Sequence, residues 1–86
     1  MTELMNIGFG NLVNTDKIIA IVTPDSAPAK RLVQRAKQEE RVVDATQGRK
    51  TRSIIIMDKD IVVLSASGPA TLAGRFHELA GIKEDE

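Results

Sequence analysis

The sequence predicts an α+β fold, in which a small, mainly antiparallel sheet carries two helices in the order β-β-α-β-β-β-α. Two segments have apolar residues at helical spacing, and each is opened by a Ser and a Pro. Short runs of Ile and Val bounded by turn residues indicate the strands. With 86 residues, the chain has room for one domain. We expect this single domain to span residues 1–82, and residues 83–86 to form an acidic, disordered tail.

Two strands are expected before the first helix. Residues 3–7 can form a short strand, and residues 8–11 form a turn because Gly8 and Gly10 allow positive φ. Residues 17–23 contain a run of Ile and Val, whose β-branched side chains favour a second strand.

A helix should follow the polar segment that stops this strand. Either Asp25 or Ser26 can cap it, and Pro28 suits its first turn. The spacing i, i+3, i+4 and i+7 then gives the helix one apolar stripe, formed by Ala29, Leu32, Val33 and Ala36.

Three strands are expected next, at residues 41–45, 53–57 and 61–65. The last two are joined by the tight polar turn of residues 58–60 and therefore indicate a hairpin. A second helix should begin at residues 67–69 and end at Gly81. Its apolar face is formed by Leu72, Phe76, Leu79 and Ala80.

The hairpin strands are apolar at nearly every position, whereas a sheet with one wet face alternates apolar and polar residues. We expect the two helices to cover one face of the sheet. The other apolar face would then be a subunit interface, which predicts self-association. The alternative is that the helices lie on opposite faces and the chain is a monomer.

The composition gives little support for an enzyme. The chain has no Cys, so it cannot form a disulfide, a thiolate metal site or a Cys nucleophile. Its one His, His77, has no evident partner for a triad or a metal site, and Asp58 and Asp60 suit turn formation. We therefore predict a protein that is not an enzyme, with no catalytic residues, no metal, no cofactor and no small-molecule substrate.

No apolar run approaches the roughly 20 residues that span a bilayer, and the N-terminus does not resemble a signal peptide. We expect a cytoplasmic protein with no membrane partner. The net charge is zero, yet residues 17–52 contain nine basic and four acidic residues. A basic centre and an acidic tail are different surfaces with different partners.

The basic centre includes a polar connection at residues 44–52, where Arg49, Lys50 and Arg52 place three cations within four positions. Gly48 gives the backbone freedom to turn outward. Arg binds phosphate oxygens through two donors, and Lys adds a compact charge. The connection is therefore our main candidate for binding nucleic acid.

Two questions remain open at this point. The cations could instead pair with Asp44 and Asp25 in an ordinary solvated loop. Three further candidates, Lys17, Lys30 and Arg31, strengthen the site only if the fold brings them near the loop. RNA and single-stranded nucleic acid are disfavoured as partners, because Phe9 and Phe76 are the only aromatic residues available for stacking on unpaired bases.

Three blocks of the sequence, at residues 6–11, 21–31 and 43–58, resemble the RemA family of bacterial extracellular-matrix regulators. The resemblance extends from about residue 4 to residue 77. It implies a small cytoplasmic protein that binds double-stranded DNA. It also implies a ring-like homo-oligomer that activates biofilm-matrix genes.

The family's basic stretch falls on Arg49, Lys50 and Arg52, and a further basic position falls on Lys17. The family often has Arg where this chain has Lys17 and Lys50, and Lys keeps the charge without the two-pronged donor geometry. The prediction is a DNA-binding transcriptional regulator that acts as an oligomer. The alternative is a structural or protein–protein interaction module that works through an apolar sheet face.

Overall fold

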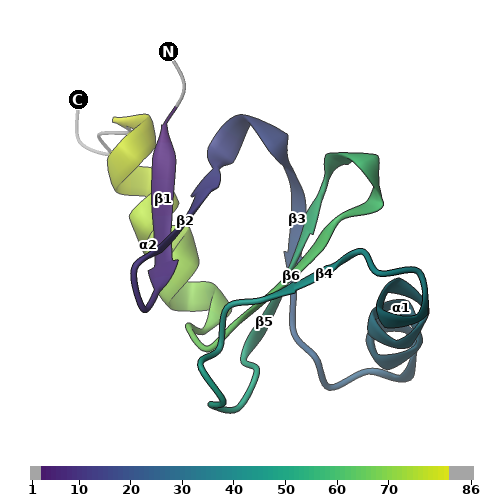
Figure 1. The fold of residues 1–86 in the computed structure, drawn as a ribbon. Coiled ribbons are helices and arrows are strands. Elements are labelled where there is room, and N and C mark those ends of the chain that lie inside the picture. The colour runs from purple at the N-terminus through teal and green to yellow at the C-terminus, as the bar shows by residue number, and fades with distance from the viewer. Residues whose placement is uncertain (1–2, 82–86) are drawn as a thin grey trace.

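The computed structural model describes residues 3–81, so the predicted acidic tail at 83–86 lies outside the described residues. The chain forms an α+β fold, as predicted (Figure 1). Its elements in chain order are β1 (Leu4–Gly8), β2 (Asn11–Asn14), β3 (Ile18–Val22), α1 (Ala27–Gln38), β4 (Val42–Asp44), β5 (Ser53–Met57), β6 (Val62–Ser65) and α2 (Pro69–Ala80).

The predicted order is confirmed except for one additional strand, β2. It pairs with β1 in an antiparallel two-stranded sheet, in which Met5 lies opposite Val13. The sequence of β2 is Asn-Leu-Val-Asn, and a pair of apolar residues between two turn-forming residues is too short to indicate a strand. The strand forms because the tight turn after Gly8 brings it back along β1.

The second sheet has four strands in the order β3-β5-β6-β4. Its β3–β5 and β5–β6 pairs are antiparallel, and the β4–β6 pair is parallel. The sheet is therefore mainly antiparallel, as predicted, with β3 and β4 at its edges. The predicted hairpin is formed by β5 and β6.

The helices lie on opposite faces of this sheet (Figure 1). Along a strand, successive side chains point to opposite faces. Ile54 and Leu64 therefore pack with α1, whereas Ile55 and Val63 pack with β1, β2 and Leu72 of α2. The prediction that both helices cover one face is wrong, because α1 alone covers its face and the β1–β2 sheet shares the other with α2.

Self-association was predicted from an apolar sheet face that the helices leave uncovered, and the four-stranded sheet has no such face. All four central side chains of the hairpin, Ile54, Ile55, Val63 and Leu64, are buried within one chain. Any assembly must therefore use surfaces other than the faces of the four-stranded sheet.

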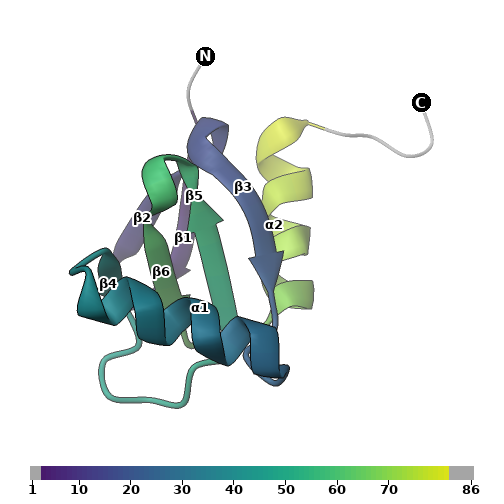
Figure 2. The same cartoon turned by 90° about the vertical axis from the view of Figure 1, so that its right-hand side faces the viewer.

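The two helices begin at the same end of this sheet (Figure 2). The pairing of Val22 with Ile54 and of Ser53 with Ser65 brings together the residues that precede α1 and α2. Ser26 caps α1 by accepting a hydrogen bond from the backbone N–H of Ala29 at 3.1 Å. None of the helices in residues 3–81 is long and apolar enough to cross a bilayer.

Candidate nucleic-acid interface

The segment of residues 45–52, which we call the basic loop, connects β4 to β5 at the end of the sheet where both helices begin. Both ends of the loop are hydrogen-bonded to β6. The backbone N–H of Ala45 donates to the carbonyl oxygen of Leu64 at 2.9 Å, and that of Arg52 donates to the carbonyl oxygen of Ser65 at 2.8 Å. The loop is therefore a short connection whose two ends are fixed to β6 by backbone hydrogen bonds.

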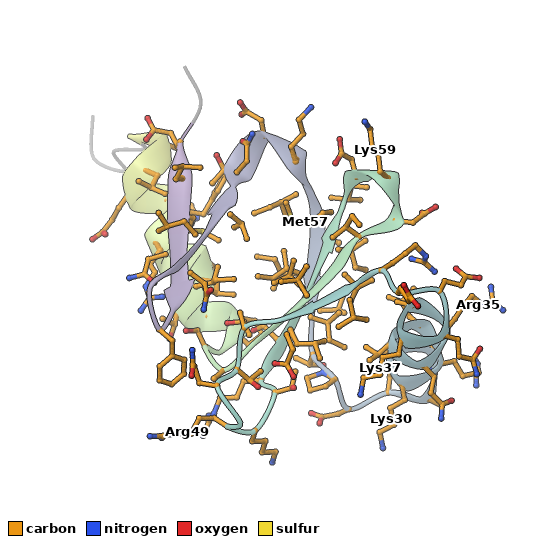
Figure 3. All side chains as sticks on the ribbon, in the orientation of Figure 1. Lys30, Arg35, Lys37, Arg49, Met57 and Lys59 are labelled. Atoms are coloured by element: carbon orange, nitrogen blue, oxygen red, sulfur yellow. The ribbon has the colours of Figure 1, made fainter. Side chains whose placement is uncertain are left out.

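The tip of the basic loop is a tight turn. The backbone N–H of Arg49 donates to the carbonyl oxygen of Thr46 at 2.9 Å. The two residues between them, Gln47 and Gly48, have φ of 54° and 78°. Positive φ at both central positions defines a type I′ turn, which favours Gly. This turn places Arg49 and Lys50 just past the tip, and Figure 3 shows Arg49 extending away from the sheet.

Asp44 and Thr46 hold the base of the loop. The Asp44 carboxylate accepts hydrogen bonds from the hydroxyl of the buried Thr46 at 2.7 Å and from its backbone N–H at 2.9 Å. The bond from the hydroxyl is the largest of the effects that lower the pKa of Asp44. The Asp44 carboxylate therefore stabilises the backbone conformation at the start of the loop.

The three cations of the loop are exposed. Across residues 3–81, neither Asp44 nor Asp25 forms an ion pair with Arg49, Lys50 or Arg52. The ion pairs assumed by the alternative of an ordinary solvated loop are therefore absent from residues 3–81, although Asp25 borders the same hollow as Lys50 and Arg52. The charges of the loop are available to an anionic partner.

The loop cations line two hollows on the surface. Arg49, Lys50 and Arg52 border a cleft of about 400 Å3, which they share with Gly8, Phe9, Ala66 and Ser67. Lys50 and Arg52 also border a smaller hollow of about 240 Å3 beside Pro69, the first residue of α2. The amino end of a helix carries a partial positive charge. Asp25 also borders this smaller hollow, so the loop cations and the amino end of α2 supply the positive charge of the surface beside one carboxylate.

Phe9 belongs to this surface, and the sequence did not indicate this. The guanidinium carbon of Arg49 lies 5.8 Å from the centroid of the Phe9 ring. The two residues are far apart in the chain and meet because the β1–β2 turn lies beside the basic loop. A Phe between two glycines in a turn was the only available hint.

The additional candidates divide into those near the loop and those away from it. Lys30 is exposed on α1 and lines a cavity of about 480 Å3 together with Lys37 and Thr51, so it lies beside the loop (Figure 3). Arg31 is exposed on α1 but borders none of the clefts described for residues 3–81 that Thr51 or the three loop cations line.

Lys17 lies at the opposite end of the sheet from the basic loop. Its ammonium nitrogen is 3.7 Å from a carboxylate oxygen of Asp58. The strand β3 separates it from the loop, because Ile18 pairs with Met57 whereas Val22 pairs with Ile54. Five residues of extended strand span about 16 Å. Within one chain, Lys17 and the loop are therefore separate positive sites.

No group of three or more His, Asp or Glu side chains within residues 3–81 is arranged to hold a metal ion. His77 lies on α2 and Asp58 and Asp60 lie in the β5–β6 turn, away from the basic loop. The structure therefore brings none of these residues into the basic surface.

A family model described as RemA-like, extracellular matrix regulatory protein A-like, matches residues 4–76. A protein of Fervidobacterium nodosum is 56% identical over 78 residues, which are 91% of this chain and 84% of that protein. A protein of Pseudothermotoga lettingae is 54% identical over 78 residues, covering 91% of this chain and 86% of that protein. A protein of Geobacillus kaustophilus is 52% identical over 77 residues, covering 90% and 88%. The names of all three begin with "Putative regulatory protein".

Proposed function

This chain belongs to the RemA-like family, and we propose that it is a transcriptional regulator that binds double-stranded DNA through the basic loop. Family membership and the names of the relatives support a regulatory role. The resemblance indicated by the sequence is confirmed by the match over residues 4–76. The activity proposed is binding and not catalysis, and its place is the cytoplasm, where bacterial DNA lies.

One observation carries the proposal: Arg49, Lys50 and Arg52 are exposed and form no ion pair within residues 3–81, on a loop whose ends are fixed. Arg side chains can each offer two parallel donors to a phosphate group. The hydroxyl of Thr51 and the amino end of α2 lie beside them and can add donors to the same phosphates. Lys30 extends the positive surface along α1.

A single loop offers few phosphate contacts, which is too few for useful affinity at cellular salt. We therefore propose that the protein acts as a ring-like homo-oligomer, in which the same loop is repeated around the assembly. DNA following such a curved surface would be selected partly by its ability to bend. Lys17 and Arg31, which lie outside the loop surface of one chain, would contact the same DNA only where the assembly presents them to it.

The exposed apolar side chains of the edge strands are available for this assembly. Ile19 lies on β3 and Val43 lies on β4, and both are exposed. Edge strands also carry unpaired backbone groups that can pair with another chain. We propose that the assembly is held at these edges and that it activates extracellular-matrix genes, as the family description suggests.

The alternative of a structural module acting through an apolar sheet face loses support at the four-stranded sheet, whereas the exposed Leu4 and Leu12 of the β1–β2 sheet remain available to it. Ile54 and Ile55, which point to opposite faces, are both buried within the chain.

A gel-shift assay with a random-sequence duplex at moderate salt tests the proposal. The parent protein should retard the duplex, whereas a variant lacking all three loop cations should not, although it folds like the parent. A parent protein that leaves the duplex unshifted would contradict DNA binding and would favour a role in protein–protein interaction.

A further inference from the structure

Phe9 occupies a backbone conformation that does not suit it. Its φ is 55°, and its neighbours Gly8 and Gly10 have φ of 107° and 79°. Positive φ is uncommon for residues other than Gly, Asn and Asp, and for a bulky residue it is strained. The turn therefore keeps a large aromatic side chain where a small or polar residue would fit the backbone better.

The same side chain contributes little to the core. Phe9 is 50% exposed, and it is not among the residues that form or pack against either hydrophobic cluster of the described chain. Neither backbone preference nor core packing explains a Phe here. A strained and exposed residue of this kind indicates a functional site.

Hydrogen bonds hold the turn in place. The side-chain amide of Asn11 donates to the carbonyl oxygen of Gly8 at 3.0 Å. The backbone N–H of Gly8 donates to the side-chain oxygen of Asn6 at 2.7 Å. The ring of Phe9 is thus presented by a preorganised turn, which reduces the entropy lost when the ring binds a partner.

The surroundings of the ring indicate the partner. Arg49 lies 5.8 Å from the ring centroid, and the cleft beside them is also lined by Lys50 and Arg52. An apolar ring beside a guanidinium group is the combination that many minor-groove proteins use. The Arg is attracted into the minor groove by its negative potential. The apolar side chain inserts between base pairs and bends the duplex.

We propose that Phe9 is an apolar wedge that enters the minor groove of double-stranded DNA beside Arg49. The inference rests on the proposed function and adds to it a contact that carries no charge. The wedge bends the duplex toward the curved path that a ring-like assembly requires. Pyrimidine–purine steps, which unstack most easily, are its preferred sites.

The variant Phe9→Asn tests the wedge, because Asn accepts positive φ and removes the ring. The melting temperature should be equal to or higher than that of the parent, since backbone strain is relieved. Duplex affinity, measured by fluorescence anisotropy, should fall about tenfold, which corresponds to about 1.4 kcal/mol of binding free energy. The slope of log affinity against log salt should stay that of the parent, because Phe9 neutralises no phosphate.

Two further variants separate the wedge from other roles of the ring. Phe76→Gln removes an exposed aromatic residue at the far end of α2 and should bind DNA like the parent. Phe9→Leu keeps an apolar side chain and should retain more affinity than Phe9→Asn. The end-to-end distance of a dye-labelled duplex should shorten when the parent binds and shorten less with Phe9→Asn.

Each contrary result has its own meaning. Unchanged affinity of Phe9→Asn would overturn the wedge while leaving DNA binding through the basic loop intact. A shallower salt slope, like that of Arg49→Ala, would show that the ring only positions Arg49. Tighter binding of the parent to single-stranded than to duplex DNA would show that Phe9 stacks on unpaired bases. Failure of the parent to bind any duplex would instead contradict the proposed function.

Discussion

The buried hydroxyl of Ser65 donates a hydrogen bond to the carbonyl oxygen of Ile7 at 2.8 Å, and this bond joins the two sheets of the protein. Ile7 precedes the turn that holds Phe9, and the carbonyl oxygen of Ser65 accepts the bond from Arg52 that ends the basic loop. One residue therefore connects the Phe9 turn to the basic loop.

Replacing Ser65 with Ala should destabilise the protein because the carbonyl oxygen of Ile7 would lose its shorter hydrogen bond and keep only the one from the Ser67 hydroxyl at 3.4 Å. We expect the free energy of unfolding, measured by urea denaturation, to fall by about 1–3 kcal/mol. Duplex affinity should fall as well, since the Phe9 turn would lose a support, whereas the backbone bond from Arg52 to the carbonyl oxygen of residue 65 would remain. Parent-like stability of Ser65→Ala would show that apolar packing and the Ser67 hydroxyl, 3.4 Å from the same oxygen of Ile7, hold the two sheets together without Ser65.

Sequence patterns predicted a helix or strand correctly where the segment itself contained the residues that favour that structure. The hairpin strands consist largely of β-branched residues, Ser26 and Pro28 open α1, and Gly81, with φ of 69°, ends α2. The strand β2 lacks such a pattern and depends on its pairing with β1. Local sequence therefore could not indicate it.

The arrangement of the elements was harder to predict. An apolar strand without alternation shows that both faces are covered, but it does not show which element covers each face. The same limit applies to the site. Arg49, Lys50 and Arg52 are neighbours in the sequence and were found together, whereas the contact of Phe9 with Arg49 and the distant position of Lys17 arise from tertiary structure.

The Asp44–Thr46 hydrogen bonds predict a pH dependence of stability. They lower the pKa of Asp44 in the folded state below its ordinary value of 3.8. The stabilisation is therefore present above that value and is lost as the pH falls through the lower, folded-state pKa. We expect Asp44→Asn to be less stable than the parent at pH 7, and the difference in melting temperature to narrow in acid. A constant difference between neutral and acid pH would mean that ionisation of Asp44 does not stabilise the loop.

Self-association should be visible in sedimentation experiments. The parent should sediment with a mass several times that of one 9.4 kDa chain. Because the sheet faces are buried, charge at an edge strand should disrupt the assembly, so Ile19→Lys or Val43→Lys should lower the mass without unfolding the chain. A parent protein that remains monomeric at micromolar concentrations would contradict the proposal that DNA is bound by many copies of the loop in one assembly.

The central claim is that the loop cations bind DNA phosphates, and the salt dependence of duplex affinity tests it most directly. The variants are Arg49→Ala, Arg52→Ala and Lys50→Ala, with Arg35→Ala and Lys59→Ala as matched controls. Arg35 lies on α1 and Lys59 in the β5–β6 turn, both away from the loop (Figure 3). Substitution of exposed residues should change stability by no more than about 0.5 kcal/mol.

Each loop arginine variant should bind duplex DNA more weakly, and the slope of log affinity against log salt should become shallower by about 0.9 for each phosphate that the variant no longer neutralises. Lys50→Ala should show a smaller effect because its ammonium group is a single point charge. The two controls should match the parent, and every variant should keep the parent's melting temperature and sedimenting mass. Parent-like slopes in the loop variants, or a loss of binding only because the assembly dissociates, would contradict the role of the loop cations in DNA binding.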